Sequence, residues 1–131
     1  MNFVIGDKDP VNRKAVENPK IDILISPERS RKKDFMKSRN SGLNQVLAKL
    51  AHKNDISIGF DFNYALNTNG KERSNLLGKM MLNVKLCSKY KVKIIICNNS
   101  KKTEEIRSED NLKSFGRILG ITNPKVKIFE Y

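Results

Sequence analysis

The sequence predicts an α/β fold built on a parallel sheet. Short apolar runs rich in β-branched residues alternate along the chain with stretches in which apolar residues recur every three or four positions. The apolar runs end in turn-forming or polar residues, which is typical of strands buried on both faces of a parallel sheet. At 131 residues, the chain is long enough for one domain with a modest core.

Four apolar runs are predicted to be strands. They span residues 3–5, 21–25, 56–60 and 92–97. The segment 122–131 remains undecided between helix and strand. Its Asn123-Pro124 pair is typical of a helix start, whereas the apolar residues that follow suit either structure.

Two helices are predicted in the first half of the chain. Asp9 and Pro10 suit the N-cap and the first turn of a helix that ends at about Glu17. Ser41 is expected to cap the second helix, because the leucines and valine that follow lie on one helical face at spacings of three and four. The second helix should cover a sheet.

Two further helices are predicted in the second half. The longest spans about residues 71–90, with an apolar face and lysines on the opposite face. Another begins at Ser108 or Asp110 and continues to about Leu119, with Gly120 as its natural C-cap.

Alternating units of this kind build β/α barrels, and four of them amount to about half of a closed barrel of eight units. We therefore expect one partial barrel domain over residues 1–131, with four to five parallel strands. A half barrel has two unpaired sheet edges, so another chain or a second copy is expected to cover them.

The chain is strongly basic. It has 26 Lys and Arg against 14 Asp and Glu, for a net charge of +12, so an anionic partner such as RNA, DNA or anionic lipid is expected. No apolar run is long enough to span a membrane and the N-terminus lacks the layout of a signal peptide, which predicts a cytoplasmic protein. Cys87 and Cys97 lie in apolar surroundings that suit reduced, buried thiols.

Residues 29–40, called here the basic segment, form the densest cluster of positive charge. The segment has six basic residues and one acid between a predicted strand and a predicted helix. It leaves the carboxyl end of a strand, where α/β folds usually bind ligands, and so we expect it to contact nucleic acid. The alternative is a solvated loop that binds nothing specific.

Few residues could form a catalytic site. The single histidine, His52, falls at the end of a predicted helix, where a surface position is expected. The sequence lacks a Gly-x-Ser-x-Gly motif, a phosphate-binding glycine-rich loop and paired zinc-ligand cysteines. Five carboxylates near strand ends could gather around Mg²⁺, although ion pairs are more usual in so basic a protein: Asp7, Asp9, Asp22, Glu28 and Asp61. We therefore expect no catalytic residue and no metal ligand.

Short motifs follow one another in a fixed order along residues 2–124. They are Asn12-Arg13-Lys14-Ala15, Ile21 to Glu28 with its Ser-Pro-Glu end, Arg39-Asn40-Ser41-Gly42, Gly70 with Arg73, Leu76 and Leu77, and Ile106-Arg107-Ser108. Together they resemble the motifs of archaeal ribonuclease P protein component 3, the family of the thirty-kilodalton subunit. Each motif alone is weak, and their shared order makes the resemblance.

The resemblance implies a truncated TIM-barrel-like fold and a non-catalytic subunit of an archaeal ribonucleoprotein. Ribonuclease P removes the 5′ leader from precursor tRNA, with its RNA performing catalysis; Mg²⁺ is expected for that RNA and no cofactor for the protein. The implied partners are the ribonuclease P RNA, precursor tRNA, the small ferredoxin-like protein subunit and other ribonuclease P proteins. The residues expected to contact RNA are Arg13, Arg29, Arg31, Lys32, Lys33, Lys37, Arg39, Arg73 and Arg107.

The chain also departs from the family pattern. Asn40 replaces the usual Asp before Ser-Gly, Asn75 stands where a second Arg is common, and residues 109–111 replace the usual Pro-Tyr-Asp. The first β/α units of the usual barrel have no counterpart before Met1, which predicts a shortened form or one half of a split protein, completed by a homodimer mate or a second half-chain. Two other functions stay open: a general basic RNA- or DNA-binding domain, and a metal-dependent hydrolase on a reduced barrel.

Overall fold

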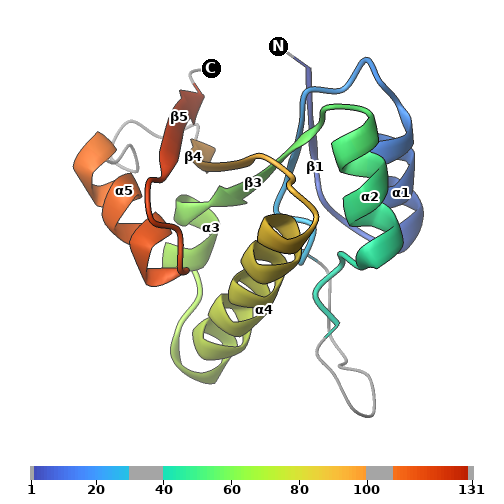
Figure 1. Ribbon diagram of the computed structural model, residues 1–131. Helices are drawn as coiled ribbons and strands as arrows, with labels where there is room; N and C mark the ends of the chain where they lie inside the picture. Colours follow the sequence, from blue (N-terminus) through green and yellow to red (C-terminus); the bar gives the residue numbers. More distant parts are fainter. Residues whose placement is uncertain (1, 30–39, 100–107, 130–131) are drawn as a thin grey trace.

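The computed structural model describes residues 2–29, 40–99 and 108–129. Within these residues, five strands form one all-parallel sheet whose spatial order is the order of the chain (Figure 1). The strands are β1 (Phe3–Ile5), β2 (Ile23–Ile25), β3 (Ser57–Asp61), β4 (Ile94–Asn99) and β5 (Lys125–Phe129). The predicted α/β class and the four predicted strands are therefore confirmed, and the undecided C-terminal segment forms a fifth strand.

In the same described parts of the chain, five helices connect the strands. They are α1 (Asp9–Glu17), α2 (Gln45–Lys53), α3 (Phe62–Leu66), α4 (Gly70–Lys89) and α5 (Glu109–Ile118). The short helix α3 is not predicted by the sequence, because one turn and a half is too short to show an apolar period. It directly follows β3 and packs Phe62 against Phe115 of α5, with ring centroids 4.7 Å apart.

One face of the sheet forms the main core with the helices. Val4, Leu24 and Ile58 lie side by side on neighbouring strands, and they pack in one apolar cluster with the inward side chains of the helices. Figure 1 shows α1 and α2 beside the β1 edge, α5 beside the β5 edge and α4 between them. Helices that all cover one face of a parallel sheet produce the layout of half a β/α barrel.

The other face of the sheet has a smaller apolar cluster. Ile23, Ile25 and Cys97 are buried there, with Phe3 and Ile95 packed against them. Gly59 of β3 lies in their midst, and a Cβ at this position would lie 3.2–3.5 Å from those three side chains. The missing side chain lets the neighbouring residues close over the middle of the sheet.

The start of α2 differs from the prediction. Asn44, and not Ser41, is the N-cap, and its side-chain oxygen accepts a hydrogen bond of 2.9 Å from the amide of Leu47. The Ser41 hydroxyl instead donates to the carbonyl of Leu43 within a buried irregular segment. Both residue types cap helices, so only tertiary packing decides which of them does so. The first helix shows a smaller shift, since its N-cap is Lys8.

The last helix begins and ends as the sequence indicates. Of the two candidates, Ser108 is the N-cap, and its hydroxyl oxygen accepts a 3.2 Å hydrogen bond from the amide of Asn111. The helix ends before Gly120, whose φ of +101° is readily adopted only by glycine.

The longest helix, α4, has 20 residues and one buried face. Leu76, Met80, Val84 and Cys87 are buried on that face, as predicted. Both cysteines are free and buried, which confirms that prediction too. No helix in the described parts of the chain has the length and apolar character needed to cross a membrane.

The close approach of α5 to the start of β5 depends on Gly116. A Cβ at this position would lie 2.6 Å from Cβ of Pro124 and 3.0 Å from Cγ1 of Ile96. We predict that Gly116→Ala lowers the free energy of unfolding by about 1–2 kcal/mol, because overpacking outweighs the roughly 1 kcal/mol gain in helix propensity. Urea denaturation tests this, with Ser114→Ala on the exposed face of the same helix as the control. A stability gain like that of the control would contradict the prediction.

Candidate nucleic-acid interface

The carboxyl ends of the parallel strands meet at one edge of the sheet, and the chain turns sharply there. Gly6 follows β1 and donates its amide to the carbonyl of Ile25 at 2.6 Å, while the amide of Ser26 donates to the carbonyl of Gly59 at 2.7 Å. A Cβ on Gly6 would collide with the carbonyl of Ser26 and would lie 2.7 Å from Cα of Pro27. Only glycine fits so close a backbone crossing.

Arg29 is the first residue of the basic segment, and it is held against the sheet edge. Its Nη2 lies 3.3 Å from Oδ2 of Asp61, the last residue of β3, and its guanidinium lies 4.0 Å from the centre of the Tyr64 ring. These two contacts make Arg29 an anchor for the chain as it leaves β2. The side chain remains 28% exposed, so part of it is still accessible to solvent.

An open hollow of about 400 Å³ lies beside this anchor. It is lined by Ile5, Gly6, Asp7, Arg29 and Tyr64. The lining combines one cation, one acid and an aromatic ring from the segments that follow β1, β2 and β3. This is the position at which β/α folds bind their ligands.

Asn12 of α1 connects the two stretches of chain that flank the basic segment. Its side chain is fully buried, and its amide nitrogen donates to the carbonyl of Pro27 at 2.9 Å and to that of Gly42 at 3.3 Å. Its side-chain oxygen accepts a 3.0 Å hydrogen bond from the amide of Asp7. One side chain therefore joins the segments that follow β1, follow β2 and precede α2.

Asn83 of α4 makes a second connection between the same flanking stretches. It is also fully buried, and its amide nitrogen donates to the carbonyl of Ser41 at 3.0 Å. The same nitrogen lies 3.5 Å from Oε2 of Glu28, at the limit of a hydrogen bond. Asn12 and Asn83, called here the asparagine pair, thus contact the residues that flank the basic segment from two different helices.

Glu28 is a buried carboxyl within this network. It is 2% exposed, and burial raises its pKa from 4.5 to about 7, against the lowering effects of hydrogen bonds and of Arg29. Its Oε1 and the side-chain oxygen of Asn83 have no hydrogen-bond partner among the described residues. A proton on Glu28 removes the buried charge and gives the carboxyl a hydrogen-bond donor, which is the form that burial favours.

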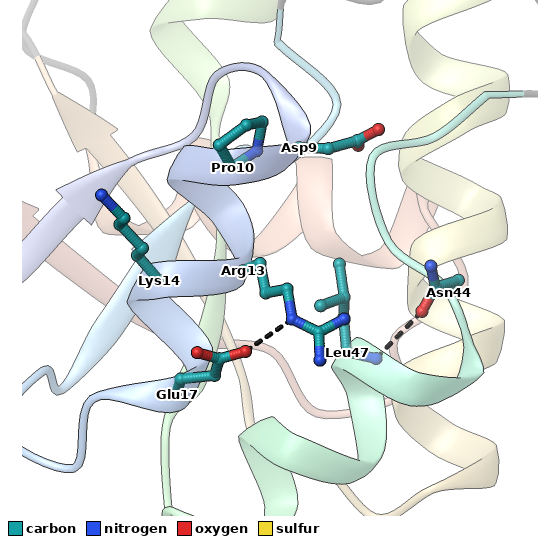
Figure 2. A pocket seen from close by; sticks show the side chains of 7 residues that line it. All are labelled: Asp9, Pro10, Arg13, Lys14, Glu17, Asn44 and Leu47. Carbon is teal, nitrogen blue, oxygen red and sulfur yellow. Dashed lines mark hydrogen bonds and ion pairs between the residues drawn. The ribbon is translucent and has the colours of Figure 1, made fainter.

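Arg13 lies away from this edge, in a groove between α1 and α2 of about 590 Å³ (Figure 2). Its side chain reaches from α1 toward Leu47 of α2, and its Nε lies 2.5 Å from Oε1 of Glu17. The side chain is 58% exposed, so it remains accessible to a phosphate. The groove is lined by Asp9, Pro10, Arg13, Lys14, Glu17, Asn44 and Leu47, and its two acids and two bases give it no single sign of charge.

The side chain of Arg73, in α4, binds two backbone carbonyls of α3. Its Nη2 donates to the carbonyl of Leu66 at 2.9 Å and its Nε to that of Ala65 at 3.3 Å. Both carbonyls lie at the end of α3, so Arg73 caps that short helix. The other residues expected to contact RNA lie outside the described residues: Arg31, Lys32, Lys33, Lys37, Arg39 and Arg107.

The five carboxylates considered for Mg²⁺ do not share one edge of the sheet. Asp22 precedes β2, and its Oδ2 accepts a 2.7 Å hydrogen bond from the amide of Asn2 at the amino edge. Asp61 ends β3 at the carboxyl edge and pairs with Arg29. Grouping these two acids around one ion was therefore wrong. Over residues 2–29, 40–99 and 108–129, no three His, Cys, Asp or Glu side chains lie close enough to hold a metal ion.

The histidine occupies the predicted surface position. His52 lies exposed in the last turn of α2, with its Nδ1 3.0 Å from the carbonyl oxygen of Lys91. This contact joins the end of α2 to the loop before β4.

Sequence reasoning missed the asparagine pair and Tyr64. Asn83 falls between Met80 and Cys87 at the spacing of the buried face of α4, and Asn12 precedes the buried Ala15 by three positions. A polar residue at a buried helical position needs a partner, so this spacing was the available signal. Tyr64 had no such signal, because α3 was not predicted.

The raised pKa of Glu28 has a consequence for stability. A carboxyl that titrates near 4.5 when unfolded and near 7 when folded favours folding below pH 4.5, and that contribution disappears as the pH rises to 7. We predict that the free energy of unfolding falls by about 3 kcal/mol relative to Glu28→Gln across this window. Urea denaturation at several pH values measures it, with Glu72→Gln, an exposed acid of α4, as the control. If the free energy of unfolding of the natural chain and of Glu28→Gln changed with pH in parallel, the raised pKa of Glu28 would be refuted.

Comparison with known proteins shows relatives from several archaea. Ribonuclease P protein component 3 of Methanosarcina mazei is 36% identical over 119 residues, which cover 91% of this chain and 46% of the relative. The protein of the same name from Methanocaldococcus jannaschii is 34% identical over 105 residues, which cover 80% of this chain and 42% of the relative. The protein of that name from Thermococcus kodakarensis is 31% identical over 125 residues, which cover 95% of this chain and 53% of the relative. The chain thus spans about half the length of these relatives.

The fold is also similar to a solved structure. A chain in a cryo-EM structure of archaeal ribonuclease P with mature tRNA superposes with a TM-score of 0.78 and 32% identity, over 90% of this chain and 48% of that chain. Residues 3–129 match the family described as RNase P subunit p30, and this range includes every strand of the sheet described above. This chain therefore belongs to the family of RNase P subunit p30.

Proposed function

We propose that this chain is a protein subunit of ribonuclease P and supports the catalytic RNA in removing the 5′ leader from precursor tRNA. The observation that supports this most is the similarity in both fold and sequence, with a TM-score of 0.78 and 32% identity, to a chain of an archaeal ribonuclease P bound to tRNA. Its partners are then the ribonuclease P RNA, precursor tRNA, the small ferredoxin-like subunit and other ribonuclease P proteins, in the cytoplasm.

Charge supports an RNA partner. The net charge of +12 and the six basic residues of the basic segment supply cations for phosphate contacts. Lys and Arg lower the repulsion between RNA helices, so the subunit reduces the Mg²⁺ concentration that the RNA needs to work. The protein positions phosphates and binds no cofactor of its own, while Mg²⁺ serves the RNA.

A reconstituted processing reaction tests the proposed function. We predict that the chain, added to the ribonuclease P RNA and the other protein subunits, raises the rate of precursor tRNA cleavage most strongly at low Mg²⁺, because its cations replace part of the ionic screening. The control is the same mixture without the chain. Protein alone with Mg²⁺ or Mn²⁺ should not cleave. Cleavage without RNA that is abolished by Asp61→Asn would favour the metal-dependent hydrolase instead.

The role of the basic segment is tested by charge removal. We predict that neutralising Arg31, Lys32 and Lys33 weakens RNA binding and lowers the slope of log affinity against log salt by about one for each phosphate that is no longer neutralised. The matched control removes three lysines from the exposed face of α4: Lys71, Lys85 and Lys89. Because both variants carry three fewer charges, an equal effect would show that net charge alone drives binding, as in a general nucleic-acid-binding domain.

A further inference from the structure

The hollow beside Arg29 combines a hydrogen-bond donor, an acceptor and an aromatic ring. Its lining comes from the end of β1 and from the segments that follow β1, β2 and β3. We propose that the hollow binds one unpaired guanine base of the RNA: Arg29 donates to the acceptors of the base, Asp7 accepts from its donors, and Tyr64 stacks on it. This inference deepens the proposed function, because it names a part of the RNA that the subunit recognises.

The charge of the hollow favours a neutral ligand over a bare phosphate. Within the lining, Asp7 balances the charge of Arg29. Arg29 is also paired with the buried Asp61, whose Oδ2 lies 3.3 Å from its Nη2. A phosphate on Arg29 would therefore meet a cation that is already neutralised, beside a second carboxylate that repels anions. A base has no net charge and avoids that repulsion.

The polar groups of the lining complement the edges of guanine. Within the described parts of the chain, Asp61 is the acceptor that binds the Arg29 guanidinium, and the buried Nε has none. The guanidinium therefore keeps donors for a ligand, and arginine donating to O6 and N7 is the commonest specific contact to guanine. The carboxylate of Asp7 can accept from the nitrogen donors of the same base. Adenine has a donor in place of O6, so this lining fits it less well.

Tyr64 supplies an aromatic surface of suitable size. The Arg29 guanidinium lies over its ring, 4.0 Å from the centre. Bases of single-stranded RNA stack on tyrosine rings and on guanidinium planes, so both members of this pair suit a base. The hollow has a volume of about 400 Å³, within the range of roughly 300–1,000 Å³ of small-molecule sites. One base fits such a space, whereas a base-paired helix does not.

The backbone around the hollow is held in place by hydrogen bonds. The amide of Gly6 donates to a carbonyl of β2, and the amide of Asp7 donates to the side-chain oxygen of Asn12 at 3.0 Å. The helix that carries Tyr64 is capped at its end by Arg73, which binds two of its carbonyls. A lining that is ordered before binding loses little conformational entropy when the ligand binds, and this preserves affinity.

Matched nucleotides test the site on the full chain. We expect guanosine 5′-monophosphate to bind about 5- to 10-fold more tightly than adenosine 5′-monophosphate in a chemical-shift titration, because the two share the phosphate and differ in the base. Asp7→Asn should reduce this preference to less than about 2-fold, since it removes an acceptor for the donors of guanine. Tyr64→Leu should weaken the binding of both nucleotides about 5-fold or more, because stacking does not depend on the base.

Two control variants make the same changes at the other edge of the sheet. Asp55→Asn removes an exposed carboxylate before β3, and Tyr90→Leu removes a ring that also lies near a lysine, with Nζ of Lys89 5.5 Å from its centre. Both controls should leave the affinities and the preference unchanged. Asp7 is partly exposed, so Asp7→Asn decides the test if Tyr64→Leu does not fold by circular dichroism.

A short oligoadenylate and the same oligomer with one central guanine distinguish an RNA base from a free nucleotide. The oligomer with guanine should bind more tightly, by a ratio similar to that of the mononucleotides. A preference seen with mononucleotides alone would overturn the RNA base as the ligand. Equal affinities within each pair, or a preference that Asp7→Asn leaves intact, would overturn the site itself.

The site and the proposed function fail in different ways. If guanine is preferred but the chain does not stimulate precursor tRNA cleavage in the reconstituted reaction, the proposed function fails and the base site stands. If the chain stimulates cleavage but does not discriminate guanine from adenine, only the base site fails.

Discussion

The need to pair buried backbone groups where the chain crosses the carboxyl edge of the sheet determines the local structure there. The carbonyls of Pro27, Ser41 and Gly42 lie outside regular secondary structure, and they obtain their hydrogen bonds from the asparagine pair. A buried carbonyl without a hydrogen-bond donor would destabilise the fold more than the burial of an asparagine side chain that supplies the donor. The same stretch of chain buries Glu28, which raises the pKa of its carboxyl, and pairs Arg29 with Asp61.

The rest of the fold follows from the covering of one face of a parallel sheet by helices. Each strand is followed by a chain segment that must return to the amino edge, and helices that pack on the same face do this while burying an apolar stripe. The order β1-β2-β3-β4-β5 is the result. This chain spans about half the length of its relatives, and it shares its fold with the matched half of the solved chain.

The sequence predicted those elements whose signal is local. The β-branched runs identified four strands, and the spacing of Leu76, Met80 and Val84 identified α4. The N-cap of α2 was wrong, because Ser41 and Asn44 are equally good caps and only tertiary packing selects between them. The candidate site was less predictable still: Arg29 and Arg73 look like free surface cations in sequence, yet both have partners more than six positions away. Long-range pairing leaves no periodic pattern to recognise.

The most direct test of the proposed subunit role is to identify the RNA bound to this chain in the cells that produce it. Ultraviolet crosslinking, purification of the chain under denaturing conditions and sequencing of the attached RNA would measure this, with a basic protein of similar size and charge as the reference. A ribonuclease P subunit is predicted to enrich ribonuclease P RNA and precursor tRNA far above the reference. Crosslinks spread over abundant RNAs, in the same proportions as the reference protein, would contradict the role.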